Sequence, residues 1–166
     1  AEMAHGIREG SFSVVEVVEA VLARIEAQNP KLNAYCTLLA DSARETAQQA
    51  DERIASGDEL GPLHGVPISI KDNLYVKDSR TTSGSKLHEH DVTTEDAPII
   101  ERLRRAGAII LGRTNTPEFG WKGVTDNRVF GITRNPWNLE LTPGGSSGGG
   151  SAAVAAGLGP IAIGTD

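Results

Sequence analysis

The sequence predicts an α/β fold, in which helices cover a β-sheet. Two features support this prediction. Residues 66–70, 94–106 and 108–112 have the patterns of a strand, a helix and a strand, which is the order of a crossover unit. The second of these strands is a continuous apolar run, as expected for a strand that is covered on both faces.

Length and composition limit the class of protein. The 166 residues suffice for one domain with a real core, and 39% hydrophobic with 23% charged residues is ordinary for a soluble chain. The net charge of −6 argues against direct nucleic-acid binding, and no apolar run reaches the ~18 residues of a membrane helix. Cys36 is the single cysteine, so we expect no intrachain disulfide and a cytoplasmic location. The chain starts at Ala1 rather than Met, so the removal of a leader peptide stays an open alternative.

Two helices are predicted near the amino terminus, after a short lead-in over residues 1–10. Ser13-x-x-Glu16 fits a capping box, and the aliphatic residues that follow it repeat at helical spacing until Asn29-Pro30, where we expect the helix to end. A second helix is predicted from about Ala40 to Ser56, with a stripe of alanines and a stop at Gly57. Both helices are interpreted as cover for the sheet.

The predicted strand 66–70 leads to a lysine. Its aliphatic residues alternate with Pro67, Ser69 and Lys71, so Ser69 and Lys71 share one face. Lys71 has two interpretations. It is either a solvated strand end or a lysine between apolar neighbours, where burial disfavours the charged form.

The segment after this strand is predicted to be a loop over residues 77–91. The run His88 to Asp91 has the residue types of a metal site, but without further clustered ligands we interpret it as a solvated turn. Thr94 is the expected cap of the next helix. Its predicted buried stripe consists of Ile99, Ile100, Leu103 and Ala106, and a further short strand is expected at residues 161–163.

Residues 115–137 form the least regular long segment and hold four of the seven aromatic residues. Long irregular segments in compact domains are usually functional or disordered, and the aromatic content argues against disorder. We favour pocket lining for these aromatics, with ordinary loop packing as the alternative.

A glycine- and serine-rich run, Pro143–Ser151, precedes a small-residue stretch that favours a helix. We predict a tight loop and a helix that begins between Ser147 and Ser151. A flexible linker is one alternative. The run also fits a G-x-S-x-G nucleophile elbow and a dinucleotide fingerprint, but no strand precedes it, and a P-loop is excluded because no Gly-Lys-Ser/Thr follows. A catalytic serine loop with its base elsewhere in the chain is the remaining interpretation.

Several motifs together resemble the amidase signature family. The resemblance extends from about Ser11 to the end of the chain and implies the amino-terminal part of that family's fold, a mixed sheet covered by helices on both faces. The chain is then a partial single domain over 1–166, with a helical region at about 11–57 and a sheet and catalytic-loop region at about 61–166. The motifs are residues 61–73, 112–119, 135–137, 143–149 and 164–166.

The resemblance also implies a Ser-Ser-Lys triad. Lys71 matches the lysine of the family, and Ser146 matches the middle serine, which lies on a cis peptide bond and relays the proton. The nucleophilic serine is expected four residues beyond Asp166, so we expect residues 1–166 to be inactive alone. The resemblance further implies substrate-binding positions at Ser147, Gly120, Trp121 and Thr125, and no metal or organic cofactor.

The implied activity is hydrolysis of an amide C–N bond through an acyl-serine intermediate. Three interpretations stay open. The protein is a free amidase for small carboxamides, the A subunit of the amidotransferase that amidates Glu-tRNA(Gln) or Asp-tRNA(Asn), or a catalytically incomplete fragment. Thr116-Pro117-Glu118-Phe119 departs from the Met-Asp-Glu-Phe typical of the amidotransferase protein, which favours the first. The expected partner is a small-molecule amide, with no direct nucleic acid and no membrane, and a homodimer stays open.

Overall fold

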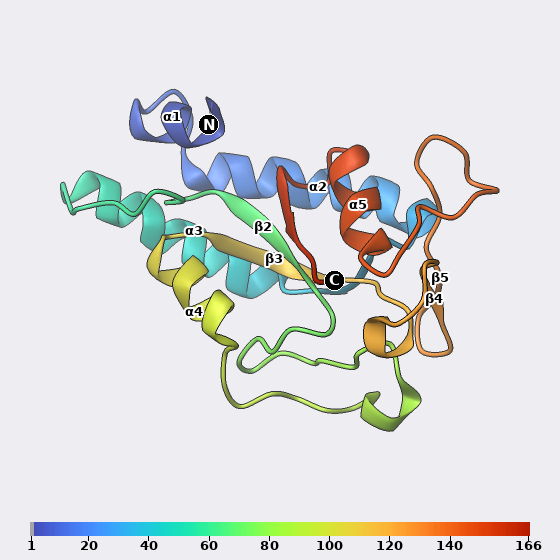
Figure 1. The fold of residues 1–166 in the computed structure, drawn as a ribbon. Helices are drawn as coiled ribbons and strands as arrows, with labels where there is room; N and C mark the ends of the chain where they lie inside the picture. Colours follow the sequence, from blue (N-terminus) through green and yellow to red (C-terminus); the bar gives the residue numbers. More distant parts are fainter. Residues whose placement is uncertain (1) are drawn as a thin grey trace.

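A computed structural model describes residues 2–166. Its centre is a four-stranded sheet of order β1-β3-β2-β6 (Figure 1). Strands β3 (Ile109–Thr114), β2 (Pro67–Lys71) and β6 (Ile161–Ile163) run parallel, and β1 (Tyr35–Leu38) pairs antiparallel with β3. The sheet is therefore mixed, as expected.

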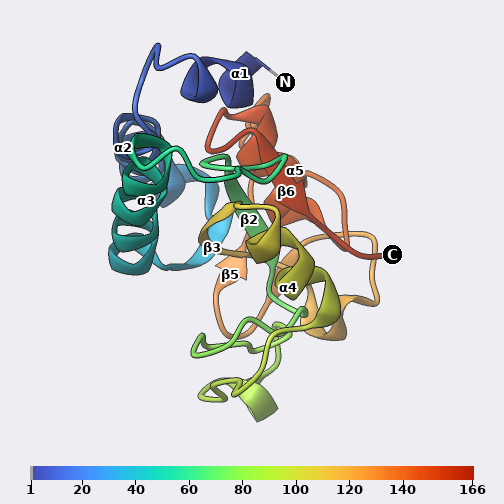
Figure 2. The same cartoon turned by 90° about the vertical axis from the view of Figure 1, so that its left-hand side faces the viewer.

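Helices cover the sheet on both faces (Figure 2). On one face, α2 (Val14–Leu32), α3 (Ala40–Ala55) and α5 (Gly148–Ala155) share a core with Ile109 and Leu111 of β3. On the other face, α4 (Pro98–Arg105) and α1 (Glu2–Arg8) enclose Ile68, Ile70 and Ile110. Because side chains of a strand alternate between faces, Ser69 and Lys71 lie on the side of α5, opposite Ile68 and Ile70.

The amino-terminal region differs from the prediction at two points. The expected lead-in contains helix α1, and α2 does not end at Asn29-Pro30 but continues to Leu32. Pro30 has no N–H and so removes one backbone hydrogen bond from the last turn of the helix. Asn33 ends the helix in a left-handed conformation, and its N–H donates to Asn29 O at 2.7 Å. The Asn29 side chain then accepts from the backbone N–H groups of Ala34 and Tyr35 and directs the chain into β1.

Helix α3 confirms the predicted alanine stripe and also supports α2. Ala43, Ala47 and Ala50 are buried against the core. Asp51 of α3 accepts hydrogen bonds from the first two N–H groups of α2, those of Val14 at 2.8 Å and Val15 at 3.1 Å. The carboxylate thus joins the predicted capping box of Ser13 and Glu16 in satisfying the start of α2.

The crossover unit is confirmed, with α4 between the parallel strands β2 and β3. The predicted cap at Thr94 is wrong, because Pro98 fills the first position of the helix and Ala97 precedes it. Within the predicted stripe, Ile100 is buried and Ile99 is 41% exposed. The shorter helix turns only its Ile100 side fully toward the sheet.

The remaining elements are short. They are the 3₁₀ turns η1 (Lys86–His88) and η2 (Glu118–Gly120), and a two-stranded ribbon of β4 (Asp126–Asn127) and β5 (Gly131–Ile132). Helix α5 starts at Gly148, as the glycine-rich run predicts, and β6 follows at the predicted residues.

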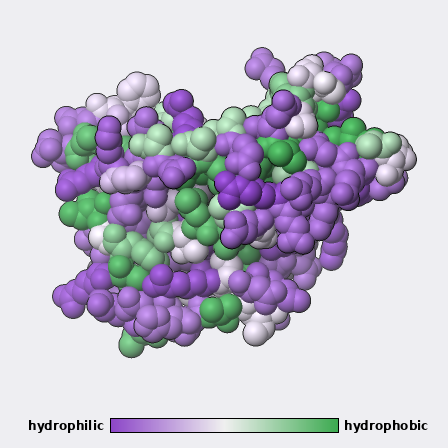
Figure 3. All heavy atoms as spheres, turned by 180° about the vertical axis from the view of Figure 1, so that it is seen from behind, coloured by the Kyte–Doolittle hydropathy of each residue, from purple (hydrophilic) through white to green (hydrophobic). Residues whose placement is uncertain are grey.

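The face of the molecule that is seen from behind (Figure 3) is mainly polar. Figure 3 shows hydrophilic residues over most of one face, with apolar residues in separate small patches. Within residues 2–166, no helix is both long and apolar enough to cross a membrane.

Candidate active site

Lys71 ends strand β2 with 1% of its surface exposed, so its interpretation as a solvated strand end is wrong. Its Nζ lies 2.7 Å from Ser146 Oγ, 2.8 Å from Thr165 Oγ1 and 3.3 Å from Thr165 O. An ammonium group has three hydrogens, which these three acceptors match. In the neutral amine, Thr165 O still takes one hydrogen, and one of the two hydroxyl groups must then donate to the nitrogen lone pair.

Burial and a nearby carboxylate shift the pKa of Lys71 in opposite directions. Burial lowers the pKa of Lys71, because removing the ammonium from water disfavours the charge. The carboxylate of Asp166 opposes this shift by favouring the charged form. Burial is the larger effect, so the pKa of Lys71 lies below its ordinary value.

Ser146 lies in the tight loop before α5. Its peptide bond with Gly145 is cis, as the resemblance implies. The buried Thr125 Oγ1 donates to Gly144 O at 2.8 Å and helps to hold the loop. A helix that begins next to this loop points its free N–H groups toward the loop.

The glycine at position 149 allows the loop and helix to approach β3. A Cβ atom placed on Gly149 would lie 2.4 Å from Asn115 N and 2.5 Å from Asn115 O. The N–H of Gly149 donates to Asn115 O at 3.2 Å. Only a residue without a side chain permits this distance, and it brings Ser146 within reach of β2.

Thr165 connects three parts of the site. Its Oγ1 accepts from Asn73 Nδ2 at 3.0 Å as well as from Lys71, and its backbone O accepts from Ser147 Oγ at 3.0 Å. Its backbone N–H donates back to Ser147 Oγ at 3.2 Å. The segment after β6 is thereby tied to the loop of Ser146 and to the turn after β2.

A buried ion pair beneath Lys71 was not predicted from the sequence. Arg113 Nε lies 3.5 Å from Asp72 Oδ1, and the two side chains are 0% and 1% exposed. Thr82 Oγ1 donates to the other oxygen of Asp72 at 2.6 Å. Burial raises the pKa of Asp72, and the hydrogen bond from Thr82 and the charge of Arg113 offset only part of this rise. Burial likewise lowers the pKa of Arg113, and Asp72 offsets only part of this fall. The available signal was the occurrence of charged residues in or next to strands that are otherwise apolar.

The four predicted substrate-binding positions lie in different surroundings. Gly120 is closest to the pair, because a Cβ there would be 3.7 Å from both Lys71 Nζ and Ser146 Oγ. Trp121, beside it, is 78% exposed. Thr125 is buried and Ser147 is bonded to Thr165, so in this structure both side chains hold the loop.

The aromatics of residues 115–137 match the pocket hypothesis only in part. Trp137 borders a cavity of about 340 Å³ together with the ends of α2 and α5. Phe119 and Trp121 are exposed on either side of Gly120. The Arg80 guanidinium carbon lies over Phe130, 5.0 Å from the centre of the phenyl ring.

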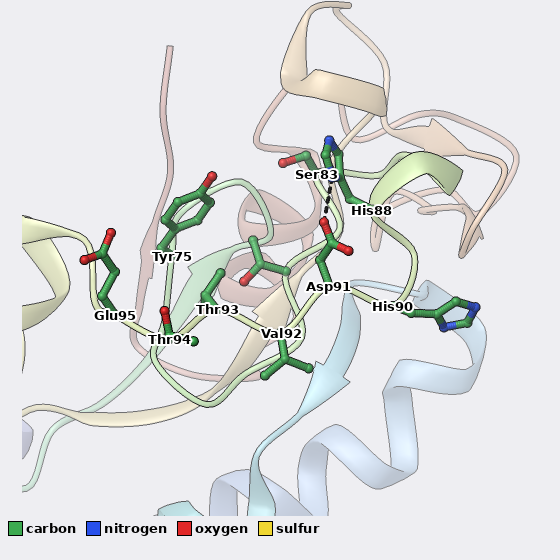
Figure 4. Close-up of a pocket in the computed structure, with 10 residues that line it drawn as sticks. Tyr75, Ser83, His88, His90, Asp91, Val92, Thr93, Thr94 and Glu95 are labelled. Atoms are coloured by element: carbon green, nitrogen blue, oxygen red, sulfur yellow. Dashed lines mark hydrogen bonds and ion pairs between the residues drawn. The ribbon is translucent and has the colours of Figure 1, made fainter.

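A larger cavity of about 460 Å³ lies in the loop that follows β2 (Figure 4). His88 Nδ1 and Asp91 Oδ2 form a pair at 2.7 Å on one side, Tyr75 and Glu95 lie on the other, and His90 points away. Neither Lys71 nor Ser146 lines this cavity. Over residues 2–166, no three His, Cys, Asp or Glu side chains are grouped as metal ligands would be.

Known proteins match the chain along almost its full length. The Amidase family model matches residues 16–166. The chain is 48% identical to the indoleacetamide hydrolase of Bradyrhizobium diazoefficiens over 99% of its own length and 32% of that protein. It is 46% identical to the A subunit of the glutamyl-tRNA(Gln) amidotransferase of Carboxydothermus hydrogenoformans, over 99% of this chain and 34% of the relative.

Solved structures agree with the sequence comparisons. A bacterial aryl acylamidase of the amidase signature enzymes superposes with a TM-score of 0.92 at 36% identity, over 95% of this chain and 33% of that one. The chain therefore spans about a third of the length of the relatives it matches. The fold, the family match and the likeness to these enzymes agree, and the chain belongs to the amidase signature family.

Proposed function

We propose that the protein carrying this chain hydrolyses amide C–N bonds, with Lys71 as the base and Ser146 as the proton relay. The observation that supports this most directly is the 2.7 Å contact between Lys71 Nζ and Ser146 Oγ around a lysine that burial favours as neutral. The resemblance to the family supplies the third group, a nucleophilic serine beyond Asp166. A lysine works as a base only in its neutral form, and burial lowers the pKa of Lys71 in that direction.

The first half of the reaction forms an acyl-serine ester. The nucleophilic hydroxyl passes its proton to Ser146 Oγ while Ser146 passes its own proton to the Lys71 lone pair. The freed oxygen attacks the amide carbon and forms the new C–O bond. The C–N bond then breaks, and the amine leaves with the proton returned from Lys71 through Ser146.

The second half releases the acid. A water molecule gives its proton to the same path, attacks the ester carbon and displaces the serine oxygen, which regains a proton from Ser146. The sum is an amide and water converted to a carboxylic acid and an amine. In each half the proton moves to Lys71 when the nucleophile attacks and returns through Ser146 to the leaving group, so Lys71 and Ser146 end each half in their starting states.

A small carboxamide or aryl amide is the substrate class that we favour. Relatives at 46–48% identity are named for indoleacetamide and acylamide hydrolysis. Gly120 leaves space over Lys71 and Ser146, and the exposed indole of Trp121 beside it offers an apolar surface to an aryl group.

The test uses the full-length protein and a carboxamide such as indoleacetamide. Lys71→Ala and Ser146→Ala should each lower kcat by roughly 10²–10⁴-fold, and the double variant should lose little more, because both residues serve one proton path. Ser151→Ala is the matched control, since this exposed serine of α5 bonds only to Ser147 O. Additive losses, or full activity without Lys71, would contradict the proposal.

The role of an amidotransferase A subunit is a second candidate, because several relatives of the same identity carry that name. It would use the same residues to release ammonia from glutamine. Steady hydrolysis of indoleacetamide by the purified protein, without glutamine activity, favours the free amidase. Glutamine hydrolysis that depends on added partner proteins and charged tRNA favours the second candidate.

A further inference from the structure

The turn after β2, residues 71–74, presents two side chains to the same place. Lys71 reaches Ser146 and Thr165, and Asn73 donates to Thr165 Oγ1. The turn is closed by Leu74 N–H on Lys71 O at 3.1 Å. The direction of both side chains therefore depends on how this short piece of backbone is held.

The Arg113 guanidinium holds this backbone from below. Its Nη2 donates to the carbonyl oxygens of both Lys71, at 3.3 Å, and Leu74. Arg113 comes from β3, the neighbouring parallel strand, where Ile70 is its register partner. A planar guanidinium with several fixed N–H groups can contact two carbonyl groups and a carboxylate together, which an ammonium group cannot do in the same geometry.

Asp72 keeps the guanidinium in this position. Its Oδ1 lies 3.5 Å from Arg113 Nε, and its Oδ2 is fixed by the hydroxyl and the N–H of Thr82. Both charged side chains are fully buried, so each needs the other for compensation. Asp72 N–H donates to Thr114 O and continues the ladder between β2 and β3.

We propose that Arg113, oriented by Asp72, is a positioning residue for the reaction: it fixes turn 71–74 so that Lys71 meets Ser146 and Asn73 meets Thr165. This inference rests on the proposed role of Lys71. Arg113 touches backbone oxygens and Asp72, and its effect on the reaction passes through Lys71. Since a displacement of about 1 Å in a catalytic group can cost 10²-fold in rate, a loosened turn lowers kcat.

The test separates positioning from simple stability. In the full-length protein, the double variant Arg113→Met with Asp72→Asn removes both buried charges together, so no unpaired charge is left and we expect the fold to be retained. It should lower kcat by about 10–100-fold with KM within about twofold, because the carbonyl groups of Lys71 and Leu74 lose their clamp. The exposed pair Arg53 and Asp58, at 3.2 Å, gives the matched control: Arg53→Met with Asp58→Asn should leave kcat unchanged.

A second variant covers the case in which the double variant does not fold. Arg113→Lys keeps the charge beside Asp72 but cannot reach both carbonyl groups, and it should also lower kcat without raising KM. A folded double variant, or a folded Arg113→Lys variant, with kcat within about twofold of the unaltered protein would overturn the inference. The proposed function fails separately, if Lys71→Ala retains activity in the same assay.

Discussion

Replacement of Gly149 by alanine tests why the loop before α5 contains glycine. The new Cβ would lie 2.4 Å and 2.5 Å from Asn115 N and O and 2.8 Å from Ala34 O. All three are backbone atoms of the segments that follow β3 or precede β1, so no side chain can rotate away. Relief requires α5 to move outward, which breaks the hydrogen bond from Gly149 to Asn115 O.

The expected change in unfolding free energy is the sum of two losses and one gain. Overpacking against rigid backbone costs about 3 kcal/mol, the upper end of the usual range. The lost hydrogen bond costs about 1 kcal/mol. Alanine gains about 1 kcal/mol over glycine in helix propensity. The net expectation is a loss of about 3 kcal/mol in unfolding free energy. The proposed amidase activity should also fall, because Ser146 moves away from Lys71.

Urea unfolding of the full-length protein measures this change, and Gly123→Ala is the control. A Cβ at Gly123 has nothing within 4 Å, so that variant should stay within about 0.5 kcal/mol of the unaltered protein. If Gly149→Ala unfolds at the same urea concentration as Gly123→Ala and keeps its activity, the close-approach argument for this loop is refuted.

Two further predictions concern the charge of Lys71 and the end of α2. Because the proposed reaction needs neutral Lys71, kcat/KM should fall as pH drops through the lowered pKa of Lys71. Asp166→Asn removes a carboxylate that favours the charged form, so the acid limb of the pH-rate profile should move to lower pH, and a shift to higher pH would count against the assignment. Asn29→Ala removes three hydrogen bonds, to Ala34 N and to Tyr35 N and O, and should lower the unfolding free energy by about 2–3 kcal/mol. Urea unfolding measures this change, and the control variant Gln28→Ala, at the exposed neighbouring residue, should alter the unfolding free energy by less than about 0.5 kcal/mol.

Local patterns predicted the elements that have a strong period or strong end signals. The repeat behind Ser13 predicted α2, the alanine stripe predicted α3, and the apolar run from Ala108 predicted β3. In each case the buried face and the local propensity agree. Strand β1 has only four residues and exists through its antiparallel pairing with β3, a contact about 75 residues away that no local pattern carries.

The end of α2 and the start of α4 were misplaced for a related reason. A proline marks a helix boundary only on average, and here the side chain of Asn29 and the left-handed Asn33 place the end at Leu32, two residues after Pro30. Near α4, the capping position was assigned to Thr94 although Pro98 suits the first helical position. Hydrogen-bond partners from other elements decide such ends.

The candidate site was predictable to different depths. Strand alternation gave the face of Lys71, and the glycine-rich run gave the loop and helix that carry Ser146. Their contact, across 75 residues, followed only from the resemblance to the family. The roles of Thr165 and Arg113 depend on neighbours from separate strands, so residue type and local pattern held too little information to find them.

One edge of the sheet explains why these distant residues meet. Strands β3, β2 and β6 run parallel, so their carboxyl ends lie together, and α/β proteins bind ligands at such ends. Lys71 ends the central strand β2, Asn115 follows β3 on one side, and Thr165 follows β6 on the other. Asn115 accepts a hydrogen bond from Gly149 of α5, and Thr165 accepts one from Lys71. The two strands that flank β2 therefore each lead to a residue that helps to place Lys71 and Ser146 together. A one-residue slip of β2 would turn Lys71 to the opposite face. The observed register, in which Ile68 pairs with Ile161 and Ile70 pairs with Ile163, therefore places Lys71 on the side of Ser146. The aliphatic core of the sheet thus sets the geometry of the proposed proton path.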